Sequence, residues 1–197
     1  MSSSKRHSVA PSSGPKPPVN FSSSLTIPKE AVLVGTHSIT IQSETLIHPR
    51  ARFNSTPGSI LIGRRCVIQE RCQVGAEPQV EADEDGGSSP LGGGVTLGDY
   101  VVIEAGTTIE SGGTDVGEGT VIQPGSKIGS GAKIGKYCTI TSRSVIAPRD
   151  TVPDHTVVFA NGKRRLDRRA VEPRKLALVK QISVSRKMIR SDPEKFQ

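Results

Sequence analysis

A six-residue period of aliphatic residues constrains the fold of this chain more than any other feature. It starts at Leu97, shifts by one residue in a Gly-containing turn, and then runs unbroken from Val116 to Val158. The ladder consists of Leu97, Ile103, Ile109, Val116, Ile122, Ile128, Ile134, Ile140, Ile146, Val152 and Val158. Earlier stretches consist of Ile41, Ile47, Phe53, Ile62, Ile68 and Val74, with a weaker start at Ile27, Leu33 and Ile39.

A second ladder of small residues lies four positions behind the aliphatic one. Its members are Ala31, Thr45, Ala51, Cys66, Cys72, Thr107, Thr120, Ser126, Ala132, Cys138, Ser144 and Thr156. A six-residue unit with this pattern is one short strand and one corner, and three units close a triangular turn. Stacked turns lie about 4.8 Å apart and hydrogen-bond to one another. The sequence therefore predicts an all-β protein, a parallel β-helix of about six to seven triangular turns.

Composition shifts divide the chain into three regions. Residues 1–24 are rich in Ser and Pro, and we expect a disordered arm there. Residues 25–159 hold the hexads, interrupted at residues 77–94 by an acidic and Gly-rich segment that we expect to be a mobile loop. Residues 160–197 form a basic linker followed by a C-terminal α-helix.

The C-terminal helix is predicted to begin near Pro173 and to have one apolar stripe. The stripe consists of Val171, Leu178, Ile182 and Ile189, at spacings of seven, four and seven. Two interpretations remain open: the stripe packs on one face of the β-helix, or it binds a partner. Residues 191–197 are expected to fray.

The net charge of +7 belongs to the two ends of the chain, which are basic, while the hexad region is net acidic. The basic tail after Ala160 contains only one aromatic residue, Phe196, so we do not expect nucleic-acid binding by base stacking. No apolar stretch approaches the length of a membrane span, and we expect a cytoplasmic protein. The three Cys residues fall on the small-residue ladder, where a packing role is expected.

The hexads resemble those of the hexapeptide-repeat family, whose enzymes rely on histidines, so the histidines of this chain bear on catalysis. His7 lies in the arm, and the other three are His37, His48 and His155, near opposite ends of the coil. A zinc site of the carbonic-anhydrase type needs three convergent histidines, and an acyltransferase needs a histidine base in a cleft. No Gly segment opens a helix as a phosphate loop would. We therefore predict no catalytic, cofactor-binding or metal-binding residues and no cofactor.

Several segments resemble one family within the hexapeptide-repeat proteins. They are residues 41–52 (IQSETLIHPRAR), 67–70 (VIQE), 76–78 (AEP), 102–104 (VIE) and 145–148 (VIAP). Together they resemble the family of dynactin subunit 6, the small β-helical subunit of the dynactin pointed-end complex. The resemblance implies a left-handed coil, against the usual right-handed preference of parallel crossovers.

That resemblance also implies a function. The expected role is a non-enzymatic scaffold subunit that supports dynein-driven transport along microtubules. The expected partners are a second β-helical dynactin subunit, actin-related proteins and other pointed-end subunits, with dynein adaptors and cargo bound indirectly. The expected location is cytoplasmic and cytoskeleton-associated. The alternatives are a hexapeptide-repeat acyltransferase and an inactive relative of the γ-class carbonic anhydrases.

Overall fold

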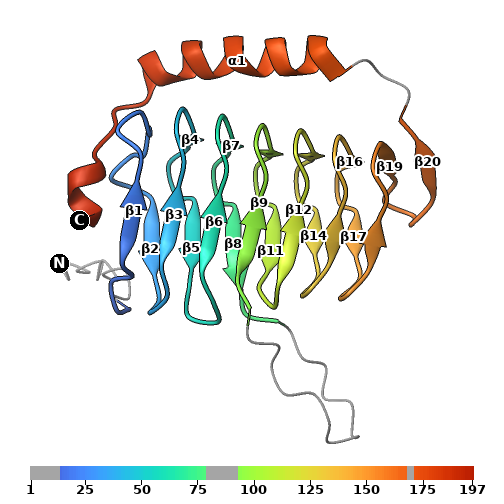
Figure 1. Cartoon of the computed structure of the whole chain (residues 1–197), viewed down its shortest axis with the longest axis horizontal. Helices are drawn as coiled ribbons and strands as arrows, with labels where there is room; N and C mark the ends of the chain where they lie inside the picture. The colour runs from blue at the N-terminus through green and yellow to red at the C-terminus, as the bar shows by residue number, and fades with distance from the viewer. Residues whose placement is uncertain (1–13, 79–92, 168–170) are drawn as a thin grey trace, which may run out of the picture.

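The computed structural model describes residues 14–78, 93–167 and 171–197, and these form a parallel β-helix with a long helix along one side (Figure 1). Three sheets make the walls of the coil. Sheet A contains β1 (Val19–Phe21), β3 (Ile39–Ile41), β6 (Ile60–Ile62), β9 (Val95–Leu97), β12 (Thr114–Val116), β15 (Lys133–Ile134) and β18 (Thr151–Val152).

Sheets B and C complete each turn. Sheet B contains β4 (Leu46–Ile47), β7 (Val67–Ile68), β10 (Val102–Ile103), β13 (Val121–Ile122), β16 (Thr139–Ile140), β19 (Thr156–Val158) and β20 (Arg164–Leu166). Sheet C contains β2 (Val32–Val34), β5 (Arg52–Asn54), β8 (Gln73–Ala76), β11 (Thr108–Glu110), β14 (Lys127–Ile128) and β17 (Val145–Ile146). All pairings are parallel except β19 with β20. The predicted β-helix is confirmed.

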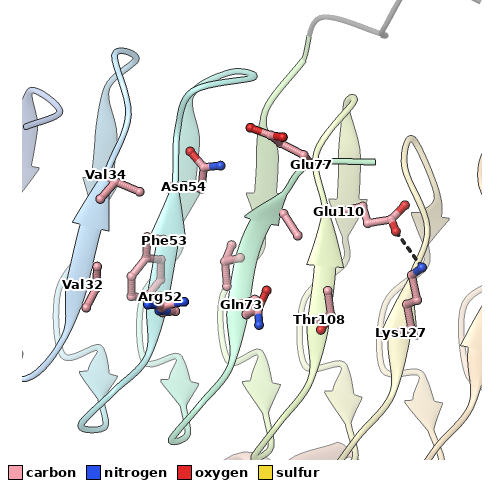
Figure 2. Close-up of a pocket in the computed structure, with 12 residues that line it drawn as sticks. Val32, Val34, Arg52, Phe53, Asn54, Gln73, Glu77, Thr108, Glu110 and Lys127 are labelled. Atoms are coloured by element: carbon pink, nitrogen blue, oxygen red, sulfur yellow. Dashed lines mark ion pairs between the residues drawn. The ribbon is translucent and has the colours of Figure 1, made fainter. Parts of the chain in front are cut away.

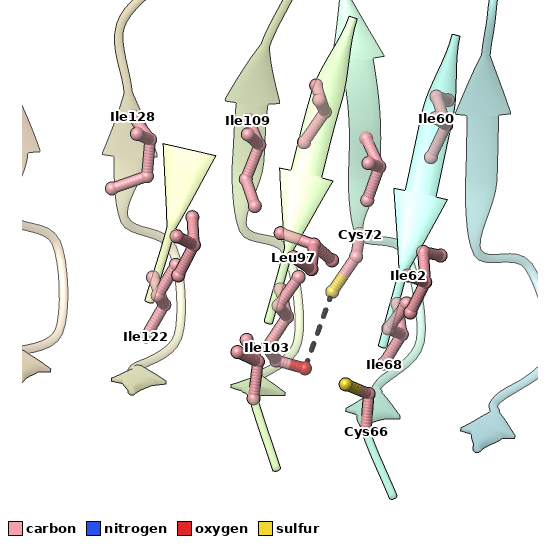
Figure 3. Close-up of a cluster of buried hydrophobic side chains, with 14 of the residues drawn as sticks. Ile60, Ile62, Cys66, Ile68, Cys72, Leu97, Ile103, Ile109, Ile122 and Ile128 are labelled. Carbon is pink, nitrogen blue, oxygen red and sulfur yellow. Dashed lines mark hydrogen bonds between the residues drawn. The ribbon is translucent and has the colours of Figure 1, made fainter. Parts of the chain in front are cut away.

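The aliphatic ladder fills the interior of the coil in register. In sheet B, for example, Ile68, Ile103 and Ile122 are paired across neighbouring turns, and each is fully buried. The small ladder lies beside the corners, where the buried thiols of Cys66 and Cys72 donate to backbone carbonyl oxygens. Figure 3 shows both side chains in the core and the longer contact of Cys72 with the Ile103 carbonyl. All three Cys residues are free and buried, as their positions on the ladder predict.

Many corners place one residue in the left-handed backbone region. These corner residues include glycines, such as Gly106 and Gly125, but also Arg65, Tyr100 and Tyr137 with φ values of 55–58°. A left-handed conformation is costly for a residue with a Cβ atom, so hydrogen bonds between turns must hold these corners. The Tyr137 amide donates to the Glu118 carbonyl at 2.8 Å, which shows how a turn fixes its neighbour.

Both ends of the coil differ from the sequence prediction. At the first end, Val19–Phe21 pairs with β3, so the coil begins inside the segment expected to be a disordered arm over residues 1–24. At the other end, β20 in the expected basic linker pairs antiparallel with β19 and covers its edge. In both places an open strand edge gains hydrogen bonds from a segment without a hexad pattern.

The C-terminal segment crosses sheet B and returns to the first turn (Figure 1). Helix α1 (Val171–Met188) is followed by a 3-10 helix, η1 (Pro193–Phe196). The Asp192 amide donates to the Ile27 carbonyl at 2.7 Å, and the Phe196 ring meets Phe21 edge-on with centroids 6.5 Å apart. The expectation that residues 191–197 fray is therefore wrong, because they cap the open first turn.

Two other predictions concern residues that lie outside the described ranges. The disordered-arm prediction for residues 1–13 and most of the mobile-loop prediction for residues 77–94 fall there. Of that second segment the structure describes Glu77, Pro78, Gly93 and Gly94, which lie at the edge of the coil. Within the described residues, no helix has the length and apolar character needed to cross a bilayer.

Candidate functional site: a groove on sheet C

The outer faces of the three sheets carry different side chains. In the outward row of sheet B, the paired residues Leu46, Val67, Val102 and Val121 are apolar. In sheet C the corresponding row begins with Val32 and continues with the residues Arg52, Gln73, Thr108 and Lys127. Sheet C therefore presents hydrogen-bonding groups at regular intervals along the coil.

These side chains line a groove of about 560 Å³ that runs along sheet C from β2 to β14. Figure 2 shows the lining residues in two rows across β2, β5, β8, β11 and β14. One row holds Val32, Arg52, Gln73, Thr108 and Lys127. The other holds Val34, Asn54, Glu77 and Glu110.

An ion pair between buried Glu110 and half-exposed Lys127 closes one end of the groove. The Glu110 carboxylate is only 3% exposed and lies 3.0 Å from the Lys127 ammonium. It also accepts a hydrogen bond from the Ser130 amide at 3.1 Å. Glu110 is therefore fixed as an acceptor by two donors, and its role is to orient Lys127 across the groove.

The rest of the groove is open to solvent. Arg52, Gln73 and Glu77 are exposed, and Asn54 is half-buried with its side-chain oxygen accepting from the Thr56 amide at 3.0 Å. A guanidinium, two amides and a carboxylate can bind a polar ligand with anionic and hydroxyl or amine groups. Among the described residues, no three His, Cys, Asp or Glu side chains are grouped as a metal site would require.

The apolar stripe predicted for the C-terminal helix lies against sheet B. Leu178 and Ile182 are buried on Leu46 and Val67, and Ile189 is partly buried on the same cluster. Val171 is half-buried at the start of α1. Leu178 and Ile182 are thus helix-docking residues within the chain, and they do not line the sheet C groove.

A clamp at the corner between sheets A and B holds the first half of α1. Lys175 lies 5.0 Å from the centroid of Tyr100 and 5.2 Å from that of Tyr137, and 2.7 Å from the Glu118 carboxylate. Tyr137 also donates to Glu118 at 2.9 Å. The hydrogen bond from Lys175 is the main cause that lowers the pKa of Glu118, and the same contact raises the pKa of Lys175.

The three histidines of the coil lie apart from the groove. His37 Nδ1 is 2.9 Å from the Ser55 carbonyl oxygen, and the His155 ring stacks on Tyr137 with centroids 5.3 Å apart. His48 is half-buried at the corner between sheets B and C, and its Nε2 has no hydrogen-bond partner in the described part of the chain. Burial is the main cause that lowers the pKa of His48.

Sequence reasoning missed the groove because its residues occupy the variable positions of the hexad. Arg52, Gln73, Thr108 and Lys127 each precede a ladder residue and follow a small one, but their types share no pattern. The fold brings them into one row because every turn of the coil places the same position of the hexad on the outer face of sheet C. The six-residue period is enough to predict that these residues share one row. It does not predict that their side chains together form a polar groove.

Comparisons with known proteins agree with this architecture. The model of the bacterial transferase hexapeptide (six repeats) family matches residues 113–148. The structure of a putative acetyltransferase, the BC4754 product of Bacillus cereus, has a TM-score of 0.66 at 20% identity, over 86% of this chain and 92% of that one. A hexapeptide transferase family protein from Anaplasma phagocytophilum has a TM-score of 0.66 at 15% identity, over 86% and 90%. No curated protein sequence matches the chain.

These findings correct one expectation from the sequence. The prediction of a non-enzymatic protein is contradicted, because the matching repeats are those of transferases and the similar solved structures are described as transferases. The prediction gave too much weight to the absence of histidine from the middle turns. On this evidence residues 113–148 match the hexapeptide repeat of the bacterial transferases, and the chain shares its parallel β-helix with the similar solved structures.

Proposed function

We propose that this protein transfers an acyl group from a thioester donor such as acetyl-CoA to an amine or hydroxyl acceptor, and that the sheet C groove holds the reactants. The match of residues 113–148 to the transferase repeat carries the proposal. That segment includes Lys127, which lines one end of the groove. Fold and repeat support the alternative of a hexapeptide-repeat acyltransferase, and the groove supplies polar groups in a concave site.

Five of the polar groove residues have a chemical role in this proposal. Arg52 and Lys127 attract the anionic donor, and Gln73 and Asn54 orient polar groups by hydrogen bonds. Glu77, the exposed carboxylate at the groove, accepts the proton of the attacking amine or hydroxyl. The nucleophile then forms a bond to the thioester carbonyl carbon, the C–S bond breaks, and the thiolate of the donor leaves and takes up a proton.

The test is loss of acetyl-CoA thioester absorbance in the presence of a panel of amine and hydroxyl acceptors. We expect acceptor-dependent turnover that falls at least about 100-fold in Glu77→Gln, the range typical for loss of a general base. Arg52→Gln should raise KM with less effect on kcat. Lys133→Gln, an exposed cation on the outer face of sheet A, is the matched control. The proposal would be refuted if the wild-type chain consumed acetyl-CoA no faster than buffer alone with every acceptor of the panel.

We also propose a role as a building block in a larger assembly of the dynactin pointed-end type. The sequence resemblance of residues 41–52 and 145–148 to the dynactin subunit 6 family favours it. A physical observation adds support: β17 is the last strand of sheet C, and its Val145 side chain is 65% exposed beside that edge. An open strand edge with an exposed β-branched residue suits addition of a partner strand.

Purification of the tagged protein at native abundance tests this second role. Recovery in a very large complex with actin-related proteins and another β-helical chain would support a place at the dynactin pointed end, in the cytoplasm and on the cytoskeleton. Recovery only as a free oligomer of this chain would refute it. Acetyl-CoA turnover is measured on the same material, so the two proposals can fail separately.

A further inference from the structure

The surface of α1 that faces away from Leu178 and Ile182, the residues that pack on sheet B, carries exposed apolar side chains. Leu176, Val184 and Met188 are 58%, 60% and 81% exposed. Among the described residues, half of the large exposed apolar side chains lie on this one helix; the others are Leu61, Val145 and Leu166. Such a concentration on a helix whose other face is already buried indicates a second contact surface.

The exposed residues follow the spacing of a helix–helix seam. Ala177, Gln181, Val184 and Met188 are all exposed and separated by four, three and four residues, as at the d and a positions of a heptad. The buried residues Leu178 and Ile182 lie between them in sequence and face the β-helix. Helix α1 therefore has one face for sheet B and another with coiled-coil spacing.

The cations of the helix are divided in the same way. Arg174, Lys175 and Arg186 contact the β-helix: Lys175 pairs with Glu118, and Arg186 donates to the Thr26 hydroxyl and the Ser24 carbonyl. Lys180 and Lys187 are exposed and seven residues apart, each directly before a seam position, where a heptad places its g residues. The seam is thus flanked on one side by positive charge, with Glu172 as the one acid of α1.

From this arrangement we propose that the outer face of α1 binds an acidic amphipathic helix of a partner protein. This surface is separate from the sheet C groove, so the inference goes beyond the proposed activity. Acidic residues beside the partner's seam would pair with Lys180 and Lys187, while its apolar residues cover Val184 and Met188. Two copies of this chain would bring like charges together on this face. Gln181 within the seam keeps the apolar strip narrow, which suits a helix better than a bilayer.

The first test uses a fluorescent synthetic peptide of about three heptads with Leu at a and d and Glu at e and g. Its anisotropy is measured with the full-length chain. We expect saturable binding that Val184→Ser/Met188→Ser weakens by about tenfold or more. The variant Lys180→Glu/Lys187→Glu should no longer bind the acidic peptide. It should instead bind a peptide in which each Glu is replaced by Lys. Lys133→Glu, which makes a single charge reversal on sheet A, should change binding less than twofold.

The outcomes are decisive in both directions. Thermal melts of each variant check that the fold is retained. The proposal would be overturned if both double variants bound the peptide as tightly as the wild-type chain. It would also be overturned if the wild-type chain bound phosphatidylserine vesicles more strongly than the peptide and both double variants lost that vesicle binding. Concentration-dependent dimerisation lost in Val184→Ser/Met188→Ser would assign the face to a second copy and would also overturn it. The reversed charge preference of Lys180→Glu/Lys187→Glu is the result that only the acidic-helix proposal predicts.

Discussion

At the scale of single residues, close contact between turns makes some glycines indispensable. A Cβ atom at Gly129 would lie 2.6 Å from the Pro148 nitrogen and 2.8 Å from the Ala147 carbonyl carbon, both backbone atoms of the next turn. At Gly106, with φ of +69°, a Cβ would meet nothing within 4 Å. The two glycines are therefore needed for different reasons, one for space and the other for backbone conformation.

Substitution of each glycine by alanine should separate these reasons. We expect Gly129→Ala to lower the free energy of unfolding by about 3 kcal/mol or more, because the neighbouring backbone cannot move aside without breaking the ladder. Gly106→Ala should cost only about 1–2 kcal/mol for the left-handed conformation. Urea denaturation followed by circular dichroism measures both. Equal losses in the two variants would contradict the close packing of turns.

The cysteines give a second prediction at this scale, which concerns thiol reactivity. Burial raises the pKa of Cys66 to about 12 and that of Cys72 to about 11. Above about pH 8.5 the thiols of the unfolded chain ionise, while those of the native protein stay protonated. The folded state then binds more protons than the unfolded state, so the free energy of unfolding falls as the pH rises further. We expect a thiol reagent at pH 8 to leave the native protein unmodified for hours and to react with all three Cys residues in urea. Rapid native labelling of Cys66 would contradict its burial.

At the scale of elements, strands within the coil are predictable and the capping elements are not. Strands such as β13 and β14 follow from the hexad period, because every turn buries the same phase. Strands β1 and β20 and helix η1 do not follow the six-residue pattern. Each of them takes its position from contact with an open strand edge or an open end of the coil. The contact of Phe196 with Phe21 joins residues at opposite ends of the chain, and no local pattern specifies such a pair.

Helix α1 depends on a small apolar contact, and we predict that this contact controls its protection. Leu178→Ala/Ile182→Ala should increase hydrogen–deuterium exchange throughout α1 and η1 while the β-helix strands stay protected. Each truncation removes about 2–3 kcal/mol of buried apolar contact. Leu176→Ala, on the exposed face, is the matched control and should not change exchange. Unaltered protection of α1 in the double variant would show that its polar contacts suffice.

The clamp at Lys175 predicts a specific dependence on pH. Because the pKa of Glu118 is lowered in the folded state, its contribution to stability is complete above its usual pKa of 4.5 and is lost as pH falls through the lower folded value. Lys175→Met should lower the melting temperature at pH 7 and reduce the further loss between about pH 5 and pH 3. Thermal melts across this range test it. If the melting temperatures of the wild-type chain and of Lys175→Met changed in parallel with pH, the ionisation of Glu118 would not be coupled to Lys175.

At the scale of the whole molecule, the chain is a three-walled prism, and two of its walls carry distinct features. Sheet B is covered by α1, sheet C holds the groove, and the outer face of α1 is open. The period in the sequence predicts the prism. The apolar stripe of the C-terminal helix leaves open whether it packs on one wall or binds a partner, and the structure places Leu178 and Ile182 on sheet B. The groove could not be predicted in the same way, because Arg52, Gln73, Thr108 and Lys127 become neighbours only through the register of the turns.

The central claim, that the sheet C groove binds an acyl donor, is tested most directly by hydrogen–deuterium exchange of the full-length chain with and without acetyl-CoA. The account predicts slower exchange, at saturating donor, in peptides that contain β5, β8 and β11, with no change in β15 or β18 of sheet A. Arg52→Gln should shift that protection to higher donor concentrations. Unchanged exchange in β5, β8 and β11 at saturating acetyl-CoA would contradict the claim.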